Sequence, residues 1–210
     1  MTDRSEYQVK TDQITLLLLF KALHDLGLAT RRLKLEKLVY FANVFAKIFG
    51  TKMTNHEFFV WKYGPFSKQV YSDVEVVVTR GFVNAKQLDE YDESDERSYE
   101  YTITKGGLSA AEKAFQDEEF SSRFDIILRT LQSIGGLTST QIRKLSYGEL
   151  DFNRAREKGM TTAINPEFPL SARMAKLAAD VAREEFRVEL SQEESALLYL
   201  KLVEALAPKR

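Results

Sequence analysis

The chain has 210 residues, of which 44% are hydrophobic and 29% are charged, and its formal net charge is −1. This is ordinary globular composition, and the chain is long enough to bury a sizeable core. The absence of cysteine excludes disulfides, thiolate metal sites and a cysteine nucleophile. The polar start MTDRSEYQVK does not read as a signal peptide, and the early apolar run is shorter than the roughly 20 residues that cross a bilayer. We therefore expect a soluble, cytoplasmic protein.

Two helices are predicted in the first fifty residues, after a polar tail at residues 1–12. An apolar run over 13–26 predicts a largely buried helix that ends at Gly27. Thr30 is the expected N-cap of the second helix, which Gly50 ends. Apolar residues recur in it at spacings of three and four, as in an amphipathic helix: Leu35, Leu38, Ala42, Phe45 and Phe49.

A short strand and a third helix follow. The segment EFFVWK at 57–62 is aromatic and β-branched, which favours a strand. Pro65 suits the first position of a helix, and Gly64 tolerates the backbone that precedes a proline. Phe66, Val70, Val74 and Val77 would share one face of that helix. A strand through VEVVV is the alternative, because β-branched residues are poorer helix formers.

The next segments, 82–88 and 98–103, alternate as the strands of a β-hairpin. Between them the charge is concentrated: residues 89–100 hold seven acids and one Arg, whereas residues 1–88 hold 13 Lys and Arg against 8 acids. Such an acidic run is typical of a solvated loop. Thr104 is the expected cap of a helix over 105–117. The order helix, helix, strand, helix, hairpin is that of a winged helix-turn-helix.

The remainder is predicted to be helical. We expect helices over 123–134, from Thr138 or Ser139 to 147, briefly within FNRAREKG, and over 171–188 and 191–206. SQEE at 191–194 has the form of a capping box, and INPEFPL at 164–170 reads as a linker. The predicted fold class is mainly α with a small β-hairpin: a winged-helix-like α+β N-terminal part followed by a helical C-terminal part.

Three segments carry a resemblance to a known family: RLKLEKLVYFANVFAKIFG, EFFVWKYGPFSKQVYSDVEV and GGLTSTQIRKLSYGELDFNRAR. In this order they resemble the Panacea domain, also called the SocA-like or phage-associated GepA-like domain. Ser146-Tyr147 stand where the family pattern has Thr-His, and Phe152 stands where Trp is common. The resemblance would make residues 13–158 the Panacea-like domain, 159–168 a linker and 169–210 a C-terminal helical pair. The first half also resembles YwgA-type winged-helix proteins.

The resemblance implies an antitoxin, which neutralises a toxin encoded beside it by binding it or by delivering it to a protease. The alternative is a winged-helix transcription regulator that binds DNA. The C-terminal helix over 191–206 has little polar face, so it either folds back on the main domain or packs against a second copy in a homodimer. A helix pair that served only self-association would make the chain a scaffold.

The stretch WKYGPF is the main candidate for contact with a protein partner. Trp61, Lys62, Tyr63, Gly64, Pro65 and Phe66 would form an exposed lip, with Tyr40 as a further partner contact. Interface hot spots are enriched in Trp, Tyr and Arg, which supports this reading. The alternative is that Trp61 and Tyr63 pack in the core below the turn, and that Tyr40 is a core residue. Strand alternation places Phe59 and Trp61 on one side and Phe58 and Val60 on the other.

A basic cluster near the start of the second helix is a candidate for nucleic-acid contact: Arg31, Arg32, Lys34 and Lys37. Two features argue against DNA binding in the usual winged-helix pose. The expected recognition helix has balanced charges, and the acidic hairpin turn would repel phosphates. Solvated cations, or cations paired with acids elsewhere, are the other reading.

No enzymatic chemistry is indicated. The two histidines, His24 and His56, have no metal-ligand spacing, and no glycine-rich phosphate-binding motif is present. We therefore expect no catalytic residues, no metal and no cofactor.

Overall fold

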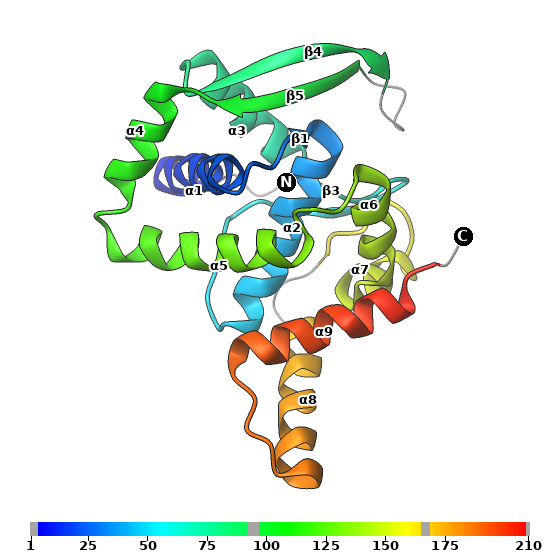
Figure 1. Cartoon of the computed structure of the whole chain (residues 1–210). Coiled ribbons are helices and arrows are strands. Elements are labelled where there is room, and N and C mark those ends of the chain that lie inside the picture. Colours follow the sequence, from blue (N-terminus) through cyan, green and yellow to red (C-terminus); the bar gives the residue numbers. More distant parts are fainter. Residues whose placement is uncertain (1–3, 92–96, 165–168, 209–210) are drawn as a thin grey trace.

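The computed structural model describes residues 4–91, 97–164 and 169–208, and helices dominate this part of the chain (Figure 1). They are α1 (Glu6–Asp25), α2 (Arg32–Ile48), α3 (Lys68–Thr79), α4 (Lys105–Ala114), α5 (Glu118–Ile134), α6 (Ser139–Gly148), α7 (Leu150–Arg156), α8 (Leu170–Phe186) and α9 (Gln192–Leu206). The strands are β1 (Thr30–Arg31), β2 (Phe59–Trp61), β3 (Gly64–Phe66), β4 (Val83–Tyr91) and β5 (Arg97–Ile103). The predicted fold class, mainly α with a small antiparallel hairpin, is confirmed.

The strands form two small antiparallel sheets. The predicted hairpin pairs β4 with β5, with Val83 opposite Ile103, and β1 extends it to the order β1-β5-β4. A second sheet pairs β2 with β3 so closely that Trp61 lies opposite Gly64. The turn of the acidic hairpin, residues 92–96, lies outside the described residues.

Several helix starts differ from the prediction. The first helix begins at Glu6, seven residues early, because Ser5 and Gln8 form a capping box that precedes the apolar run. Thr30, the expected N-cap of α2, instead pairs with Tyr101 in the sheet, and the N-cap position falls to Arg31 without a side-chain hydrogen bond.

The predicted place of Pro65 is also wrong, since it lies in β3 rather than at the start of a helix, and Ser67 is the N-cap of α3. An edge position in a two-stranded sheet tolerates proline because its missing amide costs no ladder bond there. The strand alternative through VEVVV is wrong, because this segment lies within α3, where Val70, Val74 and Val77 are buried on one face.

Other caps agree with the prediction. Thr104 accepts a hydrogen bond from the amide of Gly107, and Thr138 and Ser191 each form a capping box. The helix α5 begins at Glu118, five residues earlier than expected, because Asp117 caps it. The caps at Thr104, Thr138 and Ser191 lie within one helical turn of their partners, which is why the sequence reveals them.

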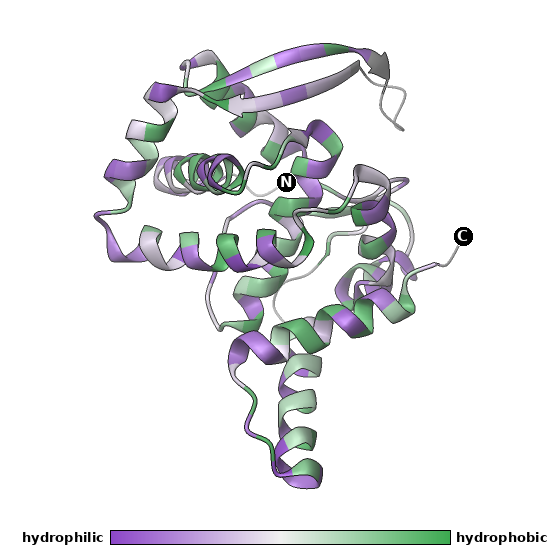
Figure 2. Ribbon diagram, viewed as in Figure 1, coloured by the Kyte–Doolittle hydropathy of each residue, from purple (hydrophilic) through white to green (hydrophobic). Residues whose placement is uncertain are grey.

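Helix α2 is the centre of the molecule. Twelve of its 17 residues are buried, and it contacts α3, α5, α6, α8 and α9 as well as β1, β3 and β5 (Figure 1). The hydropathy colours of Figure 2 show apolar residues along its length. None of the described helices is long and apolar enough to cross a membrane. The position of α2 means that polar groups on it can fix several other elements.

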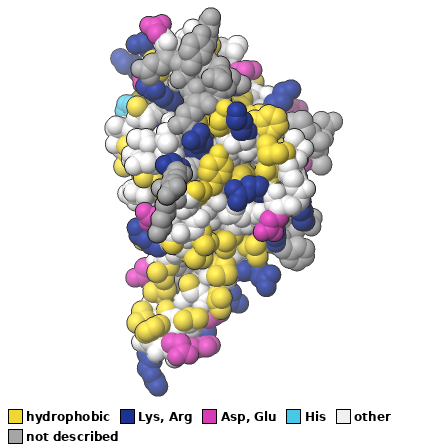
Figure 3. Space-filling model, turned by 90° about the vertical axis from the view of Figure 1, so that its right-hand side faces the viewer, with side chains coloured by type: hydrophobic (Ala, Val, Ile, Leu, Met, Phe, Trp, Pro, Cys, Tyr) yellow, Lys and Arg dark blue, Asp and Glu magenta, His cyan; other side chains and the backbone are white. Residues whose placement is uncertain are grey.

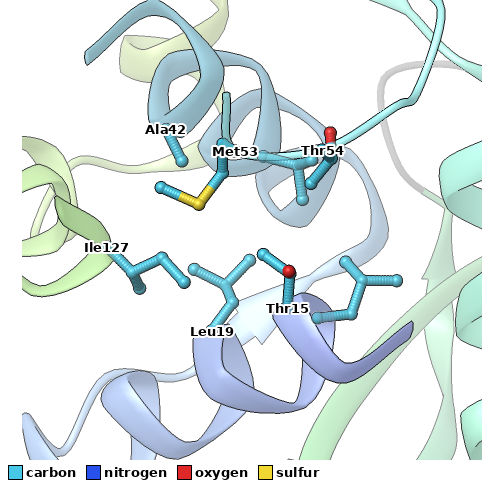
Figure 4. A pocket seen from close by; sticks show the side chains of 8 residues that line it. Thr15, Leu19, Ala42, Met53, Thr54 and Ile127 are labelled. Carbon is cyan, nitrogen blue, oxygen red and sulfur yellow. The ribbon is translucent and has the colours of Figure 1, made fainter. Parts of the chain in front are cut away.

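The interior between α1, α2 and α5 leaves only a small cavity of about 10 Å³ (Figure 4). Thr15 and Leu19 from α1, Ala42 from α2 and Ile127 from α5 face it, together with Met53. A space of this size holds roughly one water molecule. It is therefore a packing gap and not a ligand site.

A buried carboxylate joins the C-terminal helices to α2. Glu149, between α6 and α7, is fully buried and accepts hydrogen bonds from the hydroxyls of Tyr40 on α2 and Tyr199 on α9, and from the amide of Phe152. Burial, followed by the nearby carboxylate of Asp151, raises the pKa of Glu149. Burial and the charge of Glu149 also raise the pKa of both tyrosines. This junction seats α9 on the rest of the protein.

Replacing Glu149 with Gln tests the junction, because the amide keeps the shape and removes the charge. In the folded protein Glu149 keeps its proton to a higher pH than in the unfolded chain, where its pKa is about 4.3. The stability that protonated Glu149 contributes is therefore complete below about pH 4.3, the pKa in the unfolded chain, and it declines as the pH rises through the pKa of Glu149 in the folded protein. We expect the melting temperature of Glu149→Gln, relative to that of the parent, to rise between about pH 5 and pH 8.

Glu149→Ala is the control, because it leaves two buried hydroxyls and one amide without an acceptor. It should cost about 2 kcal/mol or more at every pH. A melting-temperature difference between Glu149→Gln and the parent that stays constant over this range would contradict a raised pKa.

Candidate functional site

The stretch from Trp61 to Phe66, here called the lip, consists of the last residue of β2, the turn that follows it and β3. The side chain of Trp61 is 44% exposed, so the core interpretation of this residue is wrong. Lys62 is exposed, Tyr63 and Phe66 are half-buried, and Gly64 and Pro65 are buried. The predicted alternation is confirmed: Phe58 and Val60 point inward while Phe59 and Trp61 are more exposed. The lip thus combines a buried backbone with accessible aromatic rings.

The exposed ring of Trp61 begins a row of aromatic contacts across three elements. Its centroid lies 5.8 Å from that of Phe66, and Phe66 lies 5.8 Å from Tyr71 on α3. The guanidinium of Arg32 on α2 sits 4.3 Å from the centroid of Tyr71, in cation–π contact. This set, Trp61, Phe66, Tyr71 and Arg32, is called the aromatic row below.

The other side of the lip is supported by α6. The hydroxyl of Tyr147 donates to the carbonyl of Lys62 at 2.8 Å. Arg143 lies 5.9 Å from the ring of Tyr63, and the ammonium of Lys62 lies 5.0 Å from the same ring. In Figure 3, which shows the face that carries β3 and α6, hydrophobic and cationic side chains are intermingled. The candidate surface is therefore aromatic and positively charged.

A buried ion pair on α2 fixes the backbone of the lip. The ammonium of Lys37 donates to Glu36 Oε2 at 2.6 Å and to the carbonyl of Pro65 at 2.6 Å. Glu36 Oε1 accepts from the amide of Ser67 at 2.9 Å. Both side chains are almost completely buried, and burial lowers the pKa of Lys37 although Glu36 opposes this. Neighbouring residues of α2 thus bind both ends of the Pro65–Ser67 segment.

Gly64 is required at the turn for two reasons. Its φ is +96°, a conformation that side chains with a Cβ rarely adopt. A Cβ at this position would also lie 2.6 Å from Ser146 Oγ and 3.4 Å from Lys37 Cε. The lip therefore packs directly against α6 with no room for a side chain.

The structure separates the remaining candidates into surface and interior residues. Tyr40 is buried and donates to Glu149, and Lys37 is enclosed beneath the lip, so in this structure neither side chain reaches a partner or a phosphate. Arg31 is exposed, whereas Arg32 and Lys34 are half-buried, and burial lowers the pKa of Lys34. The expected basic cluster is thus divided between the core and the surface.

Two residues of the site are not among those that the sequence predicts. Tyr71 follows Phe66 by five residues on α3, and an aromatic side chain so soon after the lip is the one signal that points to it. Arg143 lies on α6, 80 residues after Tyr63, and no local pattern connects them. Only the tertiary fold brings them together.

A separate buried polar cluster joins the N-terminus to α3. The Asp12, His56 and Asp73 side chains offer ligand atoms within 4.8 Å of one another, a spacing that could hold a metal ion. Arg4 already bridges the two carboxylates at 2.7 and 2.6 Å, and His56 Nε2 lies 2.8 Å from Asp73. Burial would raise the pKa of Asp73, but the hydrogen bonds from His56 and Arg4 lower it below its ordinary value. Because Arg4 already pairs with both carboxylates and His56 contacts Asp73, the potential ligand atoms have protein partners, and we assign no metal here.

The comparison with known families identifies the class of this domain. Residues 35–150 match the family described as antitoxin SocA-like, Panacea domain. The match covers more than half of the chain, so the chain belongs to this family, and membership supports a role of the toxin–antitoxin type. No curated protein matches the chain.

The matched residues contain the lip and the α2 and α6 side chains that contact it. Glu36, Lys37, Ser146 and Glu149 all lie within 35–150, whereas α8 and α9 lie beyond it. Ser146 and Tyr147, which replace the Thr-His pair of the family pattern, both contact the lip. Two of the three departures from the pattern thus fall next to the candidate surface, whereas Phe152 is buried in α7.

Alanine at Gly64 should destabilise the protein by about 2 kcal/mol or more, because backbone strain adds to the clash with Ser146. Gly50→Ala is the matched control, since Gly50 also has positive φ but a Cβ added there would meet nothing within 4 Å. We expect it to show the strain alone, about 1 kcal/mol. Urea unfolding of Gly64→Ala/Ser146→Ala should recover the clash part of the loss; no recovery would contradict this contact.

Lys37→Met should cost about 3–5 kcal/mol, because it leaves the carboxylate of Glu36 buried without its cation. Adding Glu36→Gln removes that unpaired charge, so the double variant should be more stable than Lys37→Met alone. Lys10→Met, which removes an exposed partner of Glu6, is the control and should leave the urea midpoint nearly unchanged. A double variant that is less stable than Lys37→Met would argue against the ion pair.

Proposed function

We propose that this protein neutralises a toxin, encoded by a neighbouring gene, by direct contact through the lip and the aromatic row. The observation that carries the proposal is the half-exposed Trp61 on a backbone that is fixed from below by Glu36 and Lys37. Direct contact is the first step both of blocking a toxin and of delivering it to a protease, so the proposal covers both outcomes.

The energetics of binding favour such a surface. Trp, Tyr and Arg dominate interface hot spots, and the aromatic row contains all three. A loop that is already held in its bound shape loses less conformational entropy when a partner docks. The buried ion pair gives the lip this preorganisation, so the exposed rings are ready to fill pockets of a partner.

The charges suggest the chemistry of the partner's surface. Arg32, Lys62 and Arg143 all lie against aromatic rings of the site. We therefore expect acidic groups beside the apolar pockets that receive Trp61 and Tyr63. We also propose a second contact, between the acidic segment 89–100 and basic groups of the toxin; residues 92–96 of this segment lie outside the described part.

DNA binding is the less favoured alternative. Within the basic cluster, Lys37 is inside the core and Arg32 stacks on Tyr71. Helix α3, the expected recognition helix, carries the acidic residues Asp73 and Glu75 among its charged residues. We also propose that the protein acts without catalysis: His24 lies on the surface beside Asp25, and His56 is buried against Asp73. Neither histidine lies in the lip.

Co-expression with the product of the adjacent gene tests the proposal. The neighbour should arrest growth alone and be harmless with the parent protein. Trp61→Ala should change the melting temperature little, because the ring is half-exposed, yet weaken binding by about 2 kcal/mol or more, roughly 30-fold in Kd. Leu26→Ala, an exposed apolar residue outside the aromatic row, is the control and should bind as the parent does.

Two results would count against this function. One is a neighbour that is harmless alone or that stays unbound; the other is unchanged affinity in Trp61→Ala. Salt-sensitive binding to duplex DNA that Arg31→Glu weakens would instead support the transcription regulator.

A further inference from the structure

Helix α8 projects from the lower edge of the molecule (Figure 1), and together with α9 it carries an apolar groove with a volume of about 430 Å³. Figure 3 shows hydrophobic side chains gathered over this lower part of the molecule. The groove lies outside the family match and is distinct from the lip. Residues from both helices line it: Met174, Leu177, Ala178, Val181, Phe186 and Leu198 are the main ones.

Much of this groove is open to solvent. The exposed fractions are 51% for Leu177, 43% for Val181, 72% for Phe186 and 46% for Leu198. Neighbouring apolar side chains that are exposed together can mark an interaction site. The helices are nevertheless firmly seated, because α8 packs on α2 and α9 is held through Tyr199 and Glu149. The groove is therefore a stable surface and not the result of an undocked pair.

The shape of the groove indicates that a helix binds in it. A channel between two helices accepts the apolar side of a third helix, with anchors at i, i+3 or i+4, and i+7. Helix α8 has this pattern in Met174, Leu177 or Ala178, and Val181, and Leu177 and Val181 stand exposed on it. The chain thus offers both the groove and a helix that fits it, which is what a two-fold symmetric contact requires.

The charges along one α8 helix complement those of a second α8 helix that runs in the opposite direction. Its N-terminal half carries Arg173 and Lys176, whereas its C-terminal half carries Glu184 and Glu185; the other two charges, Asp180 and Arg183, pair with each other at 3.0 Å. Arg173 and Glu184 lie at nearly the same distance from the middle of the helix. In an antiparallel pair of α8 helices, Arg173 would face the partner's Glu184, whereas a parallel pair would place like charges together.

We propose that two copies of this protein associate through antiparallel α8 helices, each placing Leu177 and Val181 in the α8–α9 groove of the other. The contact removes the exposed apolar surface from water and brings the opposite charges of the two helices together. It does not depend on the antitoxin role, and it leaves the lip of each copy outside the contact.

Sedimentation equilibrium of the full chain tests the proposal. We expect a mass near twice 24.1 kDa at about 100 µM. Val181→Glu should sediment as a monomer with an unchanged circular dichroism spectrum, because residue 181 is exposed in the single chain. Lys113→Glu, an exposed charge reversal on α4, should remain dimeric.

The antiparallel register has its own test. Arg173→Glu and Glu184→Arg should each raise the dimer Kd about tenfold, and the combined variant should restore it. A monomeric parent, a dimer that persists in Val181→Glu, or no recovery in the combined variant would each overturn the proposal. A monomeric parent whose toxin binding is lost in Val181→Glu would assign the groove to the toxin instead.

Discussion

The buried pair of Glu36 and Lys37 is the interaction on which the candidate surface depends. Moving two charges out of water costs several kcal/mol each, and their mutual attraction offsets this only when every remaining polar site is also satisfied. Here the additional partners are backbone groups of the lip and of the residue after it: the Pro65 carbonyl and the Ser67 amide. The pair is therefore stable only while the lip is in place, and the lip keeps its shape only while the pair is intact. The core around the ion pair and the lip therefore fold together.

The same helix controls the C-terminal part through Tyr40, one turn after Lys37. Its hydroxyl donates to Glu149, which also accepts from Tyr199 on α9. Glu36 and Lys37 of α2 thus hold the lip, and Tyr40, one turn later, holds the α6–α7 junction and α9. Since Ser146 contacts the Gly64 position and Glu149 follows three residues later, α6 connects the two systems. A change at Glu36 or at Glu149 should therefore alter both the lip and the α6–α7 junction.

Local patterns predicted much of the fold, whereas the buried polar groups escaped prediction. The hairpin, the capping box of α9 and the sides taken by Val60 and Trp61 all follow from residues within a few positions of one another. The sequence places Lys37 in a basic cluster because one of its two partners, the Pro65 carbonyl, is 28 residues away. Tyr40 and Glu149 are separated by 109 residues. Strand β1 has only two residues, too few for any periodicity, and Pro65 is accepted in β3 because of an edge that the sequence does not reveal.

Within the lip, different residues determine shape and contact. Gly64 and Pro65 are buried, and contacts with Ser146 and Lys37 fix their backbone, in which Gly64 has a φ of +96°. Trp61 and Lys62 instead project their side chains outward from this backbone. Substitutions at the outward positions can therefore change the chemistry that a partner meets without changing the scaffold, because the free energy that holds the turn comes from the core. A surface built in this way lets recognition diverge among proteins while the fold stays the same.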